Sequence, residues 1–98
     1  MDQHLPHPRI YFDGNAQLAD LAYMLVRGAL DDLRALGFTP EMAIGLRFSF
    51  VQEDVGHSGN ADALTFNGTI AHSDSLGHYV LADPGGARWL SEVTGHDA

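Results

Sequence analysis

The spacing of apolar residues changes its period once along this chain, and that change constrains the fold more than any other feature. Between Ala16 and Gly37, apolar residues recur about every 3.6 positions, which predicts an amphipathic helix. From Ala43 to Glu53 they alternate with other residues, which predicts a strand. We therefore expect one long helix, ended by Gly37 and kept from resuming by Pro40, that leads directly into a sheet.

The rest of the chain predicts further strands and a short second helix. After a first sheet strand at 43–53, with Ile44, Leu46, Phe48 and Phe50 on one face, we expect strands at 62–72 and 78–82. Residues 9–12 predict a short edge strand, and residues 87–93 predict a short helix. The expected fold class is α+β: one long amphipathic helix packed on an antiparallel three- to four-stranded β-meander, with a short C-terminal helix.

Length and composition limit the classes of protein that remain. A chain of 98 residues suits one domain, so we expect a single α+β domain over 1–98, with residues 1–8 and 94–98 flexible. There is no cysteine, which excludes disulfides, thiolate nucleophiles and iron–sulfur ligation. The first residues show no signal-peptide pattern, and we therefore expect a cytoplasmic protein.

The charge of the chain is strongly one-sided. Thirteen acidic residues face five basic ones, all arginine, and the formal net charge is −8. Such a field repels the phosphates of nucleic acids and anionic membranes. We therefore expect neither as a direct partner, and expect instead a protein partner or a second copy of the chain, as in a homo-oligomer.

Three histidines are the candidate chemical groups. His72 and His78 flank a five-residue turn, so a simple hairpin would place them nearly opposite each other, and His57 lies in a loop rich in turn-forming residues. Histidine transfers protons near neutral pH, which makes these three residues candidate catalytic acids or bases. Two imidazoles with Asp74 or another carboxylate also have the chemistry of a divalent-metal site. Solvated histidines at a hairpin end are the simpler interpretation, and we predict no metal and no cofactor.

No set of residues names a reaction, so we predict a small acidic association module without catalysis of its own: a subunit, regulator or inhibitor. It would act through a free sheet edge or the broad apolar face of the helix. One alternative is a small-molecule-binding or enzymatic domain that uses His72, His78 or His57 in a pocket between helix and sheet. Another is an acidic antagonist of a nucleic-acid-binding protein, since charge complementarity selects basic partners.

Overall fold

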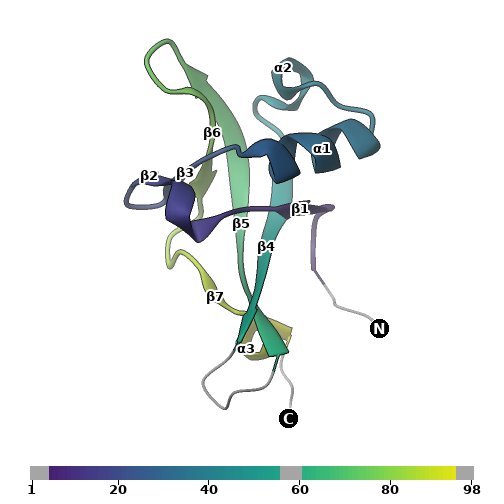
Figure 1. Cartoon of the computed structure of the whole chain (residues 1–98), viewed down its shortest axis with the longest axis vertical. Coiled ribbons are helices and arrows are strands. Elements are labelled where there is room, and N and C mark those ends of the chain that lie inside the picture. Colours follow the sequence, from purple (N-terminus) through teal and green to yellow (C-terminus); the bar gives the residue numbers. More distant parts are fainter. Residues whose placement is uncertain (1–4, 56–60, 95–98) are drawn as a thin grey trace.

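The computed structural model describes residues 5–55 and 61–94, which form an α+β fold around one mixed sheet (Figure 1). In spatial order the sheet runs β1-β4-β5-β6-β3-β2, and β7 pairs with the far part of β5. The strands are β1 (Arg9–Tyr11), β2 (Gln17–Ala19), β3 (Ala22–Met24), β4 (Arg47–Val55), β5 (Ala61–Ser73), β6 (Gly77–Ala82) and β7 (Arg88–Trp89). The helices are the single 3-10 turn η1 (Gly14–Ala16), α1 (Arg27–Ala35), α2 (Pro40–Ala43) and α3 (Leu90–Thr94).

The predicted antiparallel meander is confirmed in its central part. β4 pairs with β5 from Arg47↔Thr69 to Val55↔Ala61, and β5 pairs with β6 from Gly68↔Ala82 to Ser73↔Gly77. The sheet is nevertheless larger than the three to four strands expected. β1 adds in parallel beside β4, and β3 and β2 add beyond β6.

The prediction of one long helix from Ala16 to Gly37 is wrong. Its first half forms β2 and β3, and α1 begins only at Arg27. Between these two strands Leu21 takes a positive φ of 66°, and β3 then pairs with β6, which places Tyr23 opposite Val80. Tertiary pairing thus overrides a helix-like spacing. The C-terminal end was predicted correctly, because Gly37 has φ 93° just after α1.

The segment before β4 also differs from the prediction. The strand begins at Arg47 rather than at residue 43, and Ile44 and Leu46 are exposed. Pro40 is the first residue of α2, a position at which a backbone amide would have no hydrogen-bond partner within the helix. The hydroxyl of Thr39 accepts the amide of Met42 at 3.2 Å and caps the helix. A proline that was expected to stop a helix therefore starts one.

The core lies between α1 and one face of the sheet. Its centre is a cluster of aromatic rings in which Phe66 stacks on Tyr23 and Phe50, with centroids 5.1 and 5.2 Å apart, and meets Phe12 edge-on at 4.7 Å. Gly68 allows β5 and β6 to approach closely: a Cβ there would lie 2.7 Å from the carbonyl oxygen of Leu81. Large rings thus fill the space beside the position where β5 and β6 touch.

The opposite face of the sheet is partly covered by the segment that leads into β1. Pro8 accepts the amide of Ser49 at 2.9 Å, and the amide of His7 donates to the Ser49 hydroxyl at 3.3 Å. The expected flexibility of 1–8 and 94–98 stays a prediction, and residues 1–4 and 95–98 lie outside the described part. No helix in the described part of the chain is long and apolar enough to cross a membrane.

Candidate functional site

β1 is an edge strand of the sheet, and it lies beside a cavity. Toward β4, Pro8 accepts the amide of Ser49 and the Phe12 amide donates to Val51. Because backbone groups alternate between the two edges of a strand, Arg9 and Tyr11 direct theirs away from β4. One outward group is already engaged: the Tyr11 amide donates to Oδ2 of Asp32, on α1, at 2.8 Å. The amide and carbonyl of Arg9 and the carbonyl of Tyr11 face the open edge.

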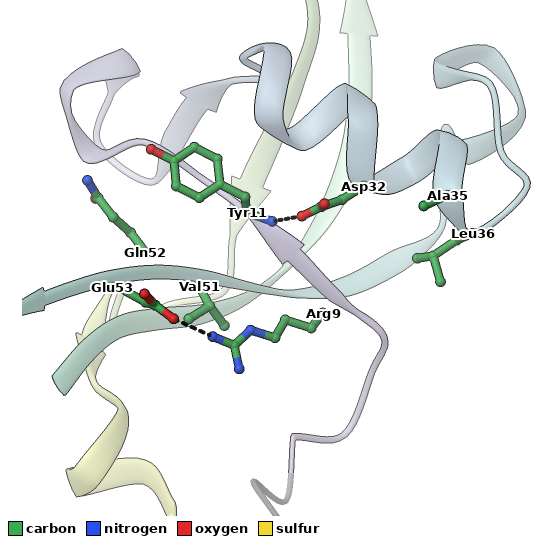
Figure 2. Close-up of a pocket in the computed structure, with 8 residues that line it drawn as sticks. All are labelled: Arg9, Tyr11, Asp32, Ala35, Leu36, Val51, Gln52 and Glu53. Atoms are coloured by element: carbon green, nitrogen blue, oxygen red, sulfur yellow. Dashed lines mark hydrogen bonds and ion pairs between the residues drawn. The ribbon is translucent and has the colours of Figure 1, made fainter. Parts of the chain in front are cut away.

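A cleft of about 510 Å³ lies at β1 and is lined by residues from both sides of this strand. Figure 2 shows α1 on one side of β1, with Asp32, Ala35 and Leu36, and β4 on the other, with Val51 and Glu53. Leu36, the residue that directly follows α1, is 45% exposed. The cleft therefore has both charged and apolar residues in its lining.

The Tyr11 ring is held at the start of the cleft by a close approach to α1. A Cβ on Gly28 would come within 2.7 Å of the Tyr11 ring carbon Cδ2, so only glycine lets the helix lie this near. Tyr11 as a whole residue is nevertheless 38% exposed. It therefore presents a half-open aromatic surface to the cleft.

The charges of the cleft are mostly acidic. Arg9 Nη2 lies 3.8 Å from Oε2 of Glu53, and both side chains are solvent-exposed, so this pair contributes little stability. Asp32 adds a second carboxylate at the edge itself. With one arginine against two acidic groups, the cleft carries a net negative charge, as the whole chain does.

A second ionic contact lies further along the same face of the sheet. Arg47, at the start of β4, binds Asp83 with both terminal nitrogens, Nη1 to Oδ1 at 3.1 Å and Nη2 to Oδ2. These hydrogen bonds, with the attraction of the guanidinium, lower the pKa of the Asp83 carboxyl and raise the pKa of Arg47. The pair fixes the turn after β6 to the beginning of β4.

The histidine hairpin was predicted correctly in its geometry. His72 and His78 are direct cross-strand partners, and their ring centroids lie 4.7 Å apart. The Nε2 atom of His78 is buried without a hydrogen-bond partner among the described residues, with Oε2 of Glu41 at 3.8 Å. The two rings therefore meet, but the catalytic role considered for them stays a prediction.

The structure describes only some of the other groups considered with the histidines. His57 lies outside the described residues. Glu53 pairs with Ala63, at the opposite end of β5 from His72, so it cannot serve the same site. Within residues 5–55 and 61–94, no three histidine or acidic side chains are placed to hold a metal ion.

Comparison with known protein families, with curated protein sequences and with solved structures gave no match. Function therefore has to be inferred from the geometry of the chain itself.

The cleft contains residues that sequence reasoning did not single out. Arg9 and Tyr11 were placed on a short edge strand, but nothing in the sequence indicated which edge stays open. Asp32 lies within the correctly predicted part of α1, where it resembles any exposed acidic residue of a helix. A possible signal was the short alternating run of β1, because a strand of three residues commonly lies at a sheet edge.

Proposed function

We propose that this chain is a non-catalytic association module that binds an extended segment of a basic partner protein along the outer edge of β1. The observation that carries the proposal is the 510 Å³ cleft beside outward-facing backbone groups of Arg9 and Tyr11. An extended peptide that adds to a sheet edge gains main-chain hydrogen bonds from such groups, and side-chain pockets give it specificity.

The dimensions of the site favour an extended segment over a helix. β1 has three residues, and its outward groups can pair with a short stretch of partner backbone. Alternate side chains of that segment would then point toward the two walls, with an apolar side chain against Leu36 and the Tyr11 ring. The interface is small, so we expect a weak and transient complex.

The charge of the chain supports a basic occupant. Asp32 and Glu53 line the cleft, and the chain as a whole carries −8. Opposite charge on a partner speeds encounter and selects against acidic competitors, whereas two copies of this chain repel each other. We therefore commit to a segment with lysine or arginine near an apolar residue, and expect its affinity to fall as salt rises.

A pair of substitutions at Arg9 tests the edge directly. Arg9→Pro removes the outward amide and places a ring in the path of an added strand, while the inward bonds of Pro8 and Phe12 to β4 do not use that amide. Arg9→Ala also removes the side chain but keeps the amide, and it is the matched control. Equal thermal unfolding of the two variants would show that the fold is intact in both.

The measurement is selection of peptides from a random displayed library on the immobilised wild-type chain. We expect selected peptides to be basic and extended, to bind wild type and Arg9→Ala with similar affinity, and to bind Arg9→Pro at least about 10-fold more weakly, since edge hydrogen bonds are lost. Peptides that bind Arg9→Pro as well as wild type would contradict the proposal. A dimer detected by light scattering that only Arg9→Pro dissociates would also contradict it, by making a second copy the occupant.

A further inference from the structure

A second cavity, of about 220 Å³, lies where the neighbour of β5 changes from β6 to β7. β6 pairs with β5 as far as Gly68↔Ala82, and β7 resumes the pairing at Thr65↔Arg88. The turn between them leaves the sheet here, held by the amide of Asp83 on the carbonyl of Asn67 at 2.9 Å. The cavity is therefore built into the sheet by a change of partner strand.

The walls of this cavity combine an apolar body with a few polar groups. Its apolar contributors come from the segment before β1, from β5 and from the turn after β6: Leu5, Pro6, Phe66 and Pro84. The polar contributors are Thr65, Asn67, Asp83 and Arg88. Small-molecule sites have this composition, with mostly apolar walls and a few polar groups that fix the orientation of the ligand.

Thr65 carries a buried hydroxyl that the fold leaves without a hydrogen bond. The residue is 3% exposed, and its Oγ1 atom has no partner among the described residues. The other buried polar side chain of this face, Ser49, is satisfied, because its hydroxyl donates to Asn67 Oδ1 at 2.7 Å. An orphaned hydroxyl costs about 1–3 kcal/mol, so its presence at a cavity wall points to a partner that binds there.

Arg88 supplies a positive charge with no partner in the described part of the chain. Its guanidinium lies against the turn, with Nη2 3.2 Å from where a Cβ of Gly85 would be. The carboxylate that lines the cavity with it, Asp83, is held by both terminal nitrogens of Arg47. The charge of Asp83 is thereby largely balanced, and the guanidinium of Arg88 stays available.

From these groups we infer that the cavity binds a small carboxylate with a flat or branched apolar body. The carboxylate would pair with the fork of Arg88, and the apolar body would lie beneath Leu5 and Pro6. Thr65 lines the same cavity, and its orphaned hydroxyl would donate to the second carboxylate oxygen from one of its staggered χ1 positions. A volume of 220 Å³ limits the ligand to less than the size of a drug molecule.

The test uses benzoate and 3-methylbutanoate as probes, with benzamide as the neutral analogue of benzoate. Backbone amide shifts of the full chain are followed by NMR during titration. We expect saturable shifts at Thr65, Asn67 and Arg88 for at least one acid, at millimolar concentration, and shifts at least about 10-fold weaker in affinity for benzamide.

Three variants complete the test. Arg88→Gln should weaken binding of the acid by about 10-fold or more, whereas Arg27→Gln, which removes an equal charge from α1, should leave it unchanged. Thr65→Val should weaken binding by about 3-fold yet raise the midpoint of thermal unfolding, because it deletes an unsatisfied hydroxyl at nearly constant shape. A purely structural role for Thr65 would move stability and leave binding unchanged.

The inference is overturned if neither acid gives saturable shifts at these positions, if benzamide binds as well as benzoate, or if Arg27→Gln weakens binding as much as Arg88→Gln. None of these results bears on the β1 edge, because the probes carry no backbone to add to a strand.

Discussion

The carboxylate of Asp32 accepts the backbone amide of Tyr11 at 2.8 Å, and so a side chain of α1 occupies one hydrogen-bonding position on the outer edge of β1. Sheet edges invite pairing with other chains, and proteins commonly limit this by covering or charging them. Here the β1 edge is covered only in part. Asp32 binds the amide of Tyr11, whereas the backbone amide and carbonyl of Arg9 face the cleft. Asp32 therefore sets where an added strand can begin.

Replacement of Asp32 by alanine should destabilise the fold by about 1 kcal/mol, because the hydrogen bond to the Tyr11 amide is lost at a solvent-accessible site. The same change should speed hydrogen exchange at the Tyr11 amide. Asp32→Asn is the control, since its side-chain oxygen can still accept that amide. Unchanged exchange at Tyr11 in Asp32→Ala would show that the contact does not protect the edge.

Replacement of Gly68 by alanine should destabilise the fold by about 1–3 kcal/mol, measured by chemical denaturation. The added methyl would lie 2.7 Å from the Leu81 carbonyl oxygen and 2.8 Å from a methyl group of Val80, and the backbone atom cannot move away cheaply. In Gly14→Ala the added methyl would meet only the flexible end of Gln52, at 3.2 Å, so this variant should lose less stability than Gly68→Ala. Equal losses in the two variants would contradict the close packing of β5 on β6.

The Arg47–Asp83 pair predicts a pH dependence of stability. Arg47 lowers the pKa of Asp83 in the folded state, so the unfolded state takes up its proton first as the pH falls. The stabilisation is complete above the unfolded pKa of about 3.9 and is lost as the pH falls through the lower, folded pKa. Asp83→Asn should therefore be less stable than wild type at neutral pH, with the difference shrinking below about pH 4. A difference that stays constant with pH would contradict this linkage.

The meander could be predicted because its information is local. Alternating apolar residues define β4 and β5. The short turn between His72 and His78 fixes the pairing of these two residues across β5 and β6. These two residues face each other as the turn length required. Patterns of period two, bounded by turn residues, survive in almost any tertiary context.

The helix prediction failed in the first half of 16–37, where the local spacing of apolar residues is compatible with both a helix and short strands. Leu18, Ala22 and Leu25 share a helix-like spacing, yet they belong to the β2–β3 region, in which Tyr23 packs against Phe12 and Phe66. The deciding interaction is the pairing of β3 with β6, more than fifty residues later in the sequence. No window within 16–37 contains that information.

The β1 edge could be anticipated as a short strand but not as a site. Its openness depends on which strand lies beside it, and its cleft depends on α1, which approaches through Gly28 and Asp32. The cavity beside Thr65 was missed for a similar reason, since it arises from the change of neighbour between β6 and β7. Both features are products of topology, which a single sequence does not display.

Hydrogen exchange at the Arg9 amide, with and without a saturating basic peptide selected on the wild-type chain, tests the proposed function most directly. Strand addition at β1 should protect this outward amide at least about 10-fold, and should leave the amides of β2, at the opposite edge of the sheet, unprotected. Protection at β2 instead, or unchanged exchange at Arg9 in a saturated complex, would contradict binding along the β1 edge.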